Sequence, residues 1–386
     1  MIPFPPSPLA NANGWPSGFD FSEVNGHVES KYSKETGQWT PLRFVASPYM
    51  SIHGMAPALN YGQQAAEGLK AFRGPGDSVV SIFRPDRNAL RMQHSADVAS
   101  MPRVPVDMFL QACRSVVALN AAFVPPHESG AALYLRPQLY GSSPHLSLSA
   151  PNEYTFCVFA VPTGIAHGAD PVKALIIDEF DRTAPNGAGH AKLGGNYAPV
   201  LRWSDEAKCK GYGITLHLDS ARHEEVDEFS TCAFIGITAH DGGDGVAITV
   251  PESRCIIESI TSDSILQIAR SYGWKTIKRP IKYTELPDFT EVIAAGTAAS
   301  LVPVRSITRQ NRSVTLPAKP NVRVDAEGET VTYIPDSRNE AGPICLKLLA
   351  ALREIQLGKV KDEFGWRCLV TEDDMQIDGG AVHNGN

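Results

Sequence analysis

Residues 186–199 read NGAGHAKLGGNYAP, which places one lysine, Lys192, among four glycines with Tyr197 close behind. Glycine weakens helices and strands, so a stretch this rich in glycine requires a local reason. One reason is a mobile surface turn, since most lysines are solvated surface charges. The other is a pocket in which bare backbone crowds around the lysine and a molecule that it binds.

A lysine amine can react with a carbonyl to form a Schiff base once burial or a nearby cation makes it nucleophilic. The best-known partner is pyridoxal phosphate, whose site needs three further parts. These are a carboxylate that keeps the pyridine nitrogen protonated, a cradle for the phosphate, and a donor to the phenolic oxygen. Each part has a candidate in this chain.

The acidic run 224–228 precedes an apolar stretch. A charge cluster of this kind is usually a solvated hairpin, and spacing alone makes Glu228 only a modest favourite for the carboxylate. Residues 260–261 stand at a predicted helix start, where free N–H groups and the helix dipole favour a phosphate. The small residues 296–298 predict a tight turn with free amides and a hydroxyl. An ordinary helix cap and close backbone packing are the alternatives, so none of these segments decides the function by itself.

Around this stretch the hydrophobic pattern predicts mixed helices and strands. Strands are predicted at 41–52, 58–64, 78–85, 131–141, 153–164, 172–178, 213–219 and 231–240. Helices are predicted at 87–101, 106–123, 198–212 and 262–274, with a hairpin turn at 240–246 and a strand–turn–strand unit at 291–307. The first part is therefore α+β with a mainly antiparallel sheet.

The length of 386 residues indicates two domains, or one large domain with an appendage. We expect a smaller N-terminal α+β domain at 1–162 and a larger domain at 172–386. The segment 163–171 is small, polar and rich in residues that break helices and strands, so we interpret it as the connection between them.

Composition excludes several classes of function. The net charge is −7 and no dense stripe of Lys and Arg is present, which argues against a nucleic-acid partner. No apolar run approaches the length of a membrane span, and the chain has no Lys or Arg before Lys31, unlike a secretory signal or a transit peptide. Seven scattered cysteines, never spaced as CxxC, argue against disulfides and metal sites and favour a cytoplasmic protein.

Six segments follow one another along the chain: LNYGQQAAEGLKAFR (59–73), IFRPDRNALRMQHSA (82–96), LYLRPQLYG (133–141), HAKLGGNYAP (190–199), DEFSTCAF (227–234) and AAGTAASLVPVRSI (294–307). In order and spacing they resemble the branched-chain amino acid aminotransferases, which are class IV pyridoxal-phosphate enzymes. The resemblance extends from about Phe44 to the C-terminus. It implies fold type IV, an α+β fold of two domains with the cofactor between them, a barrel-like core from Val172 onward, and a homodimer.

The resemblance also implies roles for single residues. Lys192 matches the Schiff-base lysine, and Tyr197 matches the donor to the phenolic oxygen of pyridoxal 5'-phosphate. Glu228 matches the partner of the pyridine nitrogen, and Arg91 matches the phosphate-binding arginine, whose fork of donors suits phosphate oxygens. The phosphate cradle is completed by Ile260, Thr261 and Thr297.

The positions where the family binds its substrate are occupied by Tyr61, Ala66, Tyr134, Arg136, Leu148, Thr297 and Ala298. By the same resemblance, the amides of Thr297 and Ala298 hold the α-carboxylate, and Arg136 suits the distal carboxylate of glutamate or 2-oxoglutarate. Tyr61 and the loop 146–148 are expected to reach into the neighbouring subunit's site. No metal is expected.

The implied reaction moves an amino group between an L-amino acid and 2-oxoglutarate in two stages. Lys192 is displaced from its Schiff base, acts as the general base, and then acts as the general acid. By this reading the glycines let the backbone of Lys192 come close beside a planar cofactor.

The chain departs from the family's pattern near the substrate and the phosphate. The departures are Ala66 in place of an aromatic residue, Ile165 and Ala166 after PTG, Leu146–Leu148 in place of an LGV-like loop, Glu258-Ser259 in place of Pro-Gly, and Ala233 in place of asparagine. Losing a Phe side chain opens considerable volume, so we expect a substrate that is branched-chain or bulkier, in a specialised biosynthetic pathway. An acidic side chain at 258 would weaken phosphate binding unless it points away.

Two alternatives remain open. One is a D-amino acid or (R)-amine transaminase, or an aminodeoxychorismate-lyase-like enzyme of the same fold. The pair Tyr134 and Arg136 argues against it, because this Tyr-x-Arg pattern is similar to that of the branched-chain group. The other is a catalytically silent paralogue that acts as a binding protein, against which the joint presence of Lys192, Tyr197 and Glu228 argues.

Overall fold

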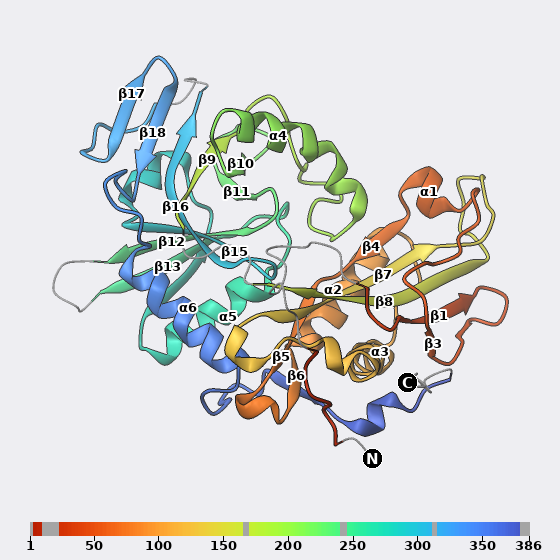
Figure 1. Ribbon diagram of the computed structural model, residues 1–386. Helices are drawn as coiled ribbons and strands as arrows, with labels where there is room; N and C mark the ends of the chain where they lie inside the picture. The colour runs from red at the N-terminus through yellow and green to blue at the C-terminus, as the bar shows by residue number, and fades with distance from the viewer. Residues whose placement is uncertain (1–2, 10–22, 165–169, 240–244, 311–314, 379–386) are drawn as a thin grey trace. The chain divides into compact units, whose positions relative to one another are not determined.

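The structure is a computed structural model, and it describes residues 3–9, 23–164, 170–239, 245–310 and 315–378 (Figure 1). The chain divides into two units. Unit 1 comprises Met1–Ala166, Ala191–Gly194 and Arg353–Asn386, and unit 2 comprises His167–His190 and Gly195–Leu352. The segment predicted to connect two domains, 163–171, includes residues 165–169, which lie outside the described residues.

Unit 1 contains a nine-stranded sheet. Its strands are β1 (His27–Ser33), β2 (Gln38–Trp39), β3 (Arg43–Val45), β4 (Gln64–Ala66), β5 (Leu69–Arg73), β6 (Val80–Phe83), β7 (Ala132–Gly141), β8 (Glu153–Thr163) and β19 (Arg367–Val370). Their order is β19-β6-β5-β7-β8-β1-β2, with β3 beside β1 and β4 beside β7. Every pair in this sheet is antiparallel, which confirms the predicted character of the first part.

Two helices pack on this sheet through one hydrophobic core. They are α2 (Pro85–Val98) and α3 (Val106–Leu119), and Figure 1 shows them beside β7 and β8. Pro85 suits the first turn of α2, because a residue there needs no hydrogen-bonded N–H. Met92 of α2 and Phe109 of α3 are fully buried in that core. Both helices were predicted from their apolar spacing.

The alternation of side chains along β7 decides what each face of the sheet presents. Leu133 and Leu135 are fully buried in the core formed with α2 and α3. Successive strand residues point to opposite faces, so Tyr134 and Arg136 lie on the other face. Two residues assigned to substrate binding are thereby placed side by side on one face.

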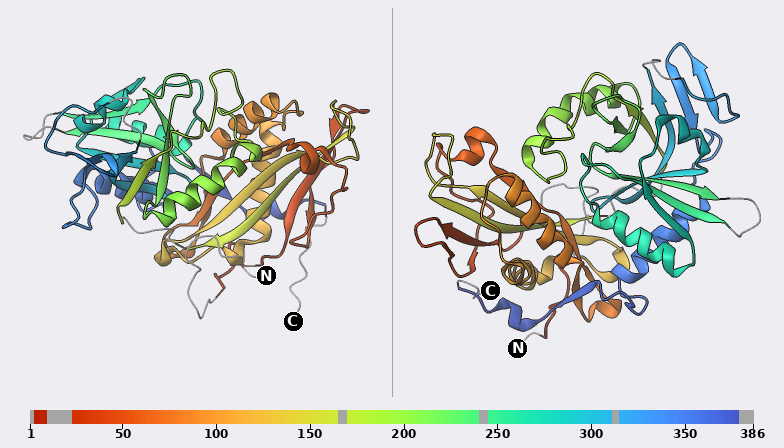
Figure 2. Two further views of the ribbon diagram at one scale, coloured as in Figure 1. Left: turned by 90° about the horizontal axis from the view of Figure 1, so that it is seen from above. Right: turned by 180° about the vertical axis from the view of Figure 1, so that it is seen from behind.

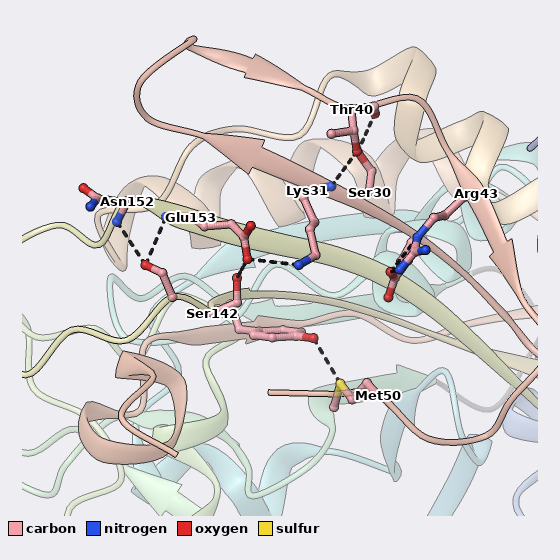
Figure 3. Close-up of polar contacts among 11 residues, drawn as sticks. Ser30, Lys31, Thr40, Arg43, Met50, Ser142, Asn152 and Glu153 are labelled. Atoms are coloured by element: carbon pink, nitrogen blue, oxygen red, sulfur yellow. Dashed lines mark hydrogen bonds and ion pairs between the residues drawn. The ribbon is translucent and has the colours of Figure 1, made fainter. Parts of the chain in front are cut away.

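The connection between β7 and β8 carries the residues 146–148 and is closed at its base by polar contacts. Ser142 Oγ donates to Glu153 Oε1 at 3.1 Å, and Lys31 Nζ of β1 reaches the same oxygen at 3.2 Å (Figure 3). Ser143 Oγ accepts the backbone N–H of Asn152 at 3.1 Å. The two ends of the loop are therefore held together.

Unit 2 contains a ten-stranded sheet. Its strands are β9 (Val172–Ile176), β10 (Ile214–Leu218), β11 (Val226–Phe229), β12 (Ala233–Ala239), β13 (Val246–Pro251), β14 (Lys275–Arg279), β15 (Glu291–Gly296), β16 (Ser300–Arg309), β17 (Val322–Asp325) and β18 (Gly328–Thr332). Their order is β11-β10-β9-β16-β15-β12-β13-β14, and β18 pairs with both β16 and β17. The hairpin of β17 and β18 extends from one end of unit 2, where it is blue in Figure 2.

Strand β16 joins the two halves of this sheet. Its first residues, from Ser300 to Pro303, pair with β15, and from Val304 onward it pairs with β9 and later β18. The predicted strand–turn–strand unit at 291–307 is confirmed by β15 and β16. The turn between them brings residues 297–299 to the end of both strands.

Unit 2 also contains α4 (Leu201–Cys209), α5 (Ile260–Ser271) and most of α6 (Pro343–Gln356). Helices α5 and α6 lie side by side in Figures 1 and 2. The carboxylate of Glu291 accepts the N–H groups of Ile344 at 3.0 Å and Cys345 at 2.9 Å. These are among the first N–H groups of α6, which have no acceptor within the helix.

Two differences between the structure and the predictions concern unit 1. Residues 58–64, predicted as a strand, form the end of α1 (Pro57–Tyr61) and the approach to β4. Pro57 opens this helix and Gly62, with φ 66°, ends it in the left-handed conformation, both of which are local helix signals. Residues 353–386, expected in the larger domain, belong to unit 1 because β19 pairs with β6.

Among the described residues, no single helix has the length and apolar character to cross a membrane. The helical segments Val106–Leu119 and Ala121–Ser129 meet that test only when taken together, across a bend of 74°. The predicted hairpin turn at 240–246 falls largely on residues 240–244, outside the described residues.

Candidate active site

The backbone of Lys192 is held on both sides within unit 1. Its N–H donates to the buried hydroxyl of Ser95 on α2 at 2.9 Å. Its carbonyl accepts the N–H of Ala66 on β4 at 3.1 Å, and the next residue, Leu193, forms a β-bridge with Ala65. The half-buried Lys192 is therefore attached to the helix and the strand that carry two of the recognised motifs.

The glycines around Lys192 make room mainly for the protein itself. A Cβ on Gly194 would lie 2.3 Å from Gln64 Oε1, and a Cβ on Gly189 would lie 2.0 Å from Thr183 Cγ2. Either contact is too short for a real side chain. By contrast, no described atom lies within 4 Å of a Cβ on Gly195, beyond its own neighbours in the chain. The expectation that glycines admit a cofactor beside Lys192 is thus replaced at 189 and 194 by close packing against Thr183 and Gln64.

Arg91 of α2 is held by a carboxylate that the sequence analysis did not select. Glu67, which links β4 to β5, accepts Arg91 Nε on Oε1 at 2.7 Å and Arg91 Nη2 on Oε2 at 2.7 Å. Asn88, one turn earlier on α2, donates to Oε2 at 2.7 Å. Glu67 is fully buried, and the side chain of Arg91 is 12% exposed.

Burial by itself would raise the pKa of the Glu67 carboxyl. The charge and hydrogen bonds of Arg91, with smaller contributions from Lys192 and Asn88, outweigh it and lower the pKa below its usual value. Glu67 is therefore a carboxylate at neutral pH. It is a buried anion paired with Arg91.

Tyr134 and Arg136 are in direct contact. Arg136 Nη2 donates to Tyr134 Oη at 3.2 Å, and the guanidinium carbon lies 5.4 Å from the centre of the tyrosine ring. A Cβ on Gly68 would lie 1.9 Å from Tyr134 Oη, so the EG pair of the first motif leaves space for this hydroxyl. The structure thus brings together the Tyr-x-Arg pair and residue 68.

Glu228 lies on β11 of unit 2 and is 5% exposed. Its Oε1 is 2.7 Å from Arg182 Nη1 in a buried ion pair, and the same oxygen accepts the N–H of Ile257 at 3.1 Å. Because Ile257 lies three residues before α5, the carboxylate and the predicted phosphate cradle are neighbours in unit 2. Arg182 was not selected from the sequence.

Three buried side chains, those of Thr215, His217 and Ser230, form a hydrogen-bonded chain. Thr215 and His217 lie on β10, and Ser230 follows the end of β11. His217 Nε2 is 2.8 Å from Ser230 Oγ, which also contacts Thr215 Oγ1. Burial, with a smaller effect of the charge on Arg182, lowers the pKa of His217 to about 3. The imidazole ring of His217 is therefore neutral at pH 7.

Helix α5 begins at Ile260, two residues earlier than predicted, with Ser259 as its N-cap. Ser259 Oγ accepts the N–H of Ser262 at 3.1 Å, and Ser259 O accepts that of Asp263 at 3.0 Å. The N–H groups of Ile260 and Thr261 have no acceptor within the helix, as is general for the first turn. Ser259, a departure from the family's glycine, is explained as the cap of this helix, and Glu258 is exposed.

Thr297 and Ala298 form the turn between β15 and β16, as expected. Gly296 begins this turn, and a Cβ there would lie 3.0 Å from Cys232 Sγ. The turn is therefore adjacent to the residues that directly follow Glu228 and Phe229. Tyr197 precedes the short helical turn Ala198–Val200, and its carbonyl accepts the N–H of Val200 at 3.1 Å.

Tyr61 and the loop 146–148 meet on the surface of unit 1. Tyr61 Oη donates to the carbonyl of Leu146 at 2.5 Å. Tyr61 is 50% exposed and Leu148 is 93% exposed. Ile165 and Ala166 lie outside the described residues.

Four buried polar residues were not predicted from the sequence: Glu67, Ser95, Arg182 and His217. Glu67 and Ser95 stand inside quoted motifs, at EG and at HSA, so their place beside Arg91 was the available signal. Arg182 lies ten residues before Lys192 with no distinguishing local pattern, and His217 alternates in a strand like a core residue. Only the tertiary structure connects these last two with Glu228.

The residues fit pyridoxal phosphate by the chemistry of their groups. Unit 1 contains the amine of Lys192 and the guanidinium of Arg91. Unit 2 contains the buried carboxylate of Glu228 and the N-terminus of α5, a place that favours phosphate. Among the described residues, no cluster of three or more His, Cys, Asp or Glu side chains could hold a metal ion.

Comparison with known proteins identifies the class. The family described as amino-transferase class IV matches residues 66–307, and the chain therefore belongs to this family. The protein is thus an aminotransferase of fold type IV, and the family implies pyridoxal phosphate as cofactor.

Individual relatives agree with this class. The chain is 50% identical over 364 residues to aminotransferase poxL of Penicillium oxalicum, covering 94% of each chain. It is 46% identical to aminotransferase atnJ of Emericella nidulans, covering 90% of this chain and 96% of that one. It is 45% identical to branched-chain amino acid aminotransferase gloG of Glarea lozoyensis, covering 96% of this chain and 99% of that one.

Solved structures share the fold. The branched-chain amino acid aminotransferase of Escherichia coli superposes with a TM-score of 0.70 at 22% identity, covering 90% of this chain and all of that one. The enzyme of Thermobaculum terrenum in its pyridoxal-phosphate form gives a TM-score of 0.66 at 19% identity, over 90% of this chain and all of that one. This likeness confirms the predicted fold class.

Proposed function

We propose that this protein transfers the amino group of an L-amino acid, branched-chain or bulkier and apolar, to 2-oxoglutarate by means of pyridoxal phosphate. The observation that carries the proposal is the attachment of Lys192 through its N–H to Ser95 and through its carbonyl to Ala66. A flexible surface lysine does not need two backbone anchors. A lysine whose amine must meet a reacting atom does, because small displacements of a catalytic group cost large factors in rate.

Bound pyridoxal phosphate supplies an electron sink that makes the α-hydrogen of an amino acid acidic. Lys192 Nζ takes up that proton and holds it for return, as a general base and then a general acid. Arg91 and the N–H groups of Ile260 and Thr261 bind the phosphate. Glu228 pairs with the ring nitrogen, and Tyr197 donates to the phenolic oxygen. The amides of Thr297 and Ala298 bind the substrate carboxylate.

The size of the substrate is proposed from unit 1. Ala66 is the residue whose N–H holds Lys192, so its short side chain lies beside the lysine where the family usually has an aromatic ring. We propose that this space admits side chains larger than that of leucine. Replacing Ala66 by Phe is expected to lower kcat/KM for bulky donors about tenfold or more while retaining leucine, because overpacking excludes large groups first.

The decisive experiment is a half-reaction screen. The purified protein loaded with pyridoxal phosphate is mixed with single L-amino acids, and the loss of cofactor absorbance is recorded. We expect rapid bleaching by apolar L-amino acids and recovery on addition of 2-oxoglutarate. A preference for leucine, isoleucine and valine over every larger donor would contradict the proposed bulky substrate. It would leave the assignment as an aminotransferase intact.

The same screen separates the alternatives. Bleaching by D-amino acids or (R)-amines alone would indicate a transaminase of the other stereochemical group. A protein that binds the cofactor and is bleached by no donor would be a silent paralogue. Tyr134 in contact with Arg136 supports the branched-chain type, since Arg136 can bind the distal carboxylate of 2-oxoglutarate.

We also propose a homodimer, working in the cytoplasm. Unit 1 presents a group of exposed large apolar side chains on α1, the segment before it and the loop between β7 and β8: Tyr49, Met50, Met55, Leu59, Tyr61, Leu146 and Leu148. These segments are joined by the bond from Tyr61 to Leu146 and by that from the His145 N–H to the Met55 carbonyl at 3.0 Å. Exposed apolar groups of this kind support an interface with another chain.

A further inference from the structure

The carboxylate of Glu67 is the centre of a buried group of donors between β4 and β5. Its Oε1 accepts Arg91 Nε at 2.7 Å, and its Oε2 accepts Arg91 Nη2 and Asn88 Nδ2, both at 2.7 Å. The N–H of Gly68 lies 3.3 Å from Oε2. The backbone of Glu67 is fixed as well, because its N–H donates to the Pro137 carbonyl of β7 at 2.8 Å.

This arrangement fixes the orientation of Arg91. A guanidinium has five N–H groups in one plane, and a bidentate contact through Nε and Nη2 determines that plane. The N–H groups on the far edge then point in one direction only. Without the carboxylate, the long arginine side chain could adopt several rotamers. Its conformational entropy would then be lost when the arginine binds a ligand, which would weaken the binding.

Stability alone does not account for this pair. A buried ion pair is weak evidence for stability, because apolar side chains of similar volume are often as good or better in its place. Glu67 is fully buried and Arg91 nearly so, at 12% exposure. The charge of Lys192 also lowers the pKa of Glu67.

We propose that Glu67 is a positioning residue for the cofactor phosphate, acting through Arg91, an inference that rests on the proposed function. Glu67 holds one edge of the guanidinium in a fixed plane, and the guanidinium in this orientation binds the phosphate. Glu67 itself touches neither the cofactor nor the substrate. Its contribution is therefore specific to ligands that carry a phosphate.

The test compares pyridoxal phosphate with pyridoxal, which lacks the phosphate, on the apoprotein of E67Q. Glutamine keeps the shape but places an NH2 group against either Arg91 Nε or the donors of Arg91 and Asn88. We expect the Kd for pyridoxal phosphate, measured by absorbance titration, to rise about tenfold, as for a lost charge-assisted hydrogen bond. The Kd for pyridoxal should stay within about twofold of wild type.

Two further variants complete the design. E29Q is the control, because Glu29 is also a buried carboxylate of unit 1 that pairs with an arginine, Arg43, and it should bind both ligands like wild type. N88A removes only one donor to Glu67 and should give the same selective loss in smaller measure, which covers the case in which E67Q folds poorly. The double variant E67Q/R91K should bind no worse than R91K alone, because Glu67 acts through residue 91.

The outcomes separate the inference from the proposed function. A selective loss of pyridoxal phosphate affinity in E67Q, or in N88A if E67Q is unfolded, supports the positioning role. An equal loss for both ligands, or no loss for either, overturns it while leaving the function intact. A wild-type protein that binds neither ligand would overturn both.

Discussion

At the scale of the residue, the site depends on how three charged side chains are held. Lys192 is fixed through its backbone by Ser95 and Ala66. Arg91 is fixed by Glu67, and Glu228 by Arg182. In each case the holding group is buried, where an unpaired polar group or charge would be costly, so both members of a pair stabilise one geometry.

Replacing Ser95 by Ala tests the backbone anchor. The Lys192 N–H loses its acceptor, and a displacement of the amine should lower the half-reaction rate about 10- to 100-fold. The Kd for pyridoxal phosphate should change about twofold at most, because Arg91 and its partner remain. Stopped-flow absorbance gives the rate. Ser115→Ala is the matched control, since Ser115 Oγ is buried on α3 without a hydrogen-bond partner, and a similar loss there would contradict the anchor.

Lys70 on β5 gives a prediction of pH dependence. Burial, with a smaller effect of the charge on Arg353, lowers its pKa from 10.5 to about 8. Below pH 8 the folded and unfolded chains both carry the proton, and the folded chain bears the full cost of a buried charge. Between pH 8 and 10.5 the unfolded chain binds more protons, so stability rises with pH in this window.

We therefore expect Lys70→Met to be more stable than wild type at pH 7, by about 2 kcal/mol, allowing for partial exposure of the lysine. The difference should shrink as pH rises from 8 toward 10.5. Urea unfolding at several pH values measures it. A difference that stays constant or grows over this window would contradict the buried charge.

At the scale of the element, local patterns predicted α2, α3 and α5, but not α6, which is as long as α2 and α3. The apolar spacing in α2, α3 and α5 follows the helical period, and each helix buries that face in its own unit. Helix α1 was not predicted, because five residues are too few to show a helical periodicity of apolar residues. Its only local signals are a proline at its start and a glycine at its end. Strand β19 was not predicted either. Its four residues are too few for the alternation of apolar and polar side chains to distinguish a strand from a loop.

Strand β19 provides the element-scale prediction. Val370 is 5% exposed in the core of unit 1, whereas its neighbour Leu369 is 56% exposed. Val370→Asp should destabilise the protein by about 3 kcal/mol or more, because it buries a charge without a partner. Leu369→Asp on the same strand should change the free energy of unfolding by about 0.5 kcal/mol at most. Equal effects of the two substitutions in urea unfolding would show that β19 does not pack against unit 1 through the face that carries Val370.

At the scale of the whole molecule, each unit is assembled from segments far apart in the sequence. In unit 1, β6 pairs with β19, and Ser95 reaches Lys192 across 97 positions. In unit 2, β9 pairs in parallel with both β10 and β16. Such pairings cannot be derived from local propensity, because the same strand would be equally stable beside several partners.

The proposed dimer gives the prediction at this scale. Leu148 is 93% exposed in the apolar group of unit 1, and an aspartate there should place a charge in the interface. Leu148→Asp is expected to shift the protein from dimer toward monomer in sedimentation velocity. Val324→Asp, at an apolar residue that is 58% exposed on β17, should leave the dimer unchanged. A monomeric wild type would remove the proposal.

The sequence by itself determined the family and three of the longer helices, because ordered motifs and apolar spacing do not depend on distant neighbours. Through the resemblance, it also proposed Lys192, Arg91 and Glu228 as site residues. Only the tertiary structure decided what holds them: Glu67 on Arg91, Arg182 on Glu228, and Ser95 on Lys192. The physical reason is that a buried hydrogen bond or ion pair depends on distance in space, and the fold brings these partners within about 3 Å across tens of residues.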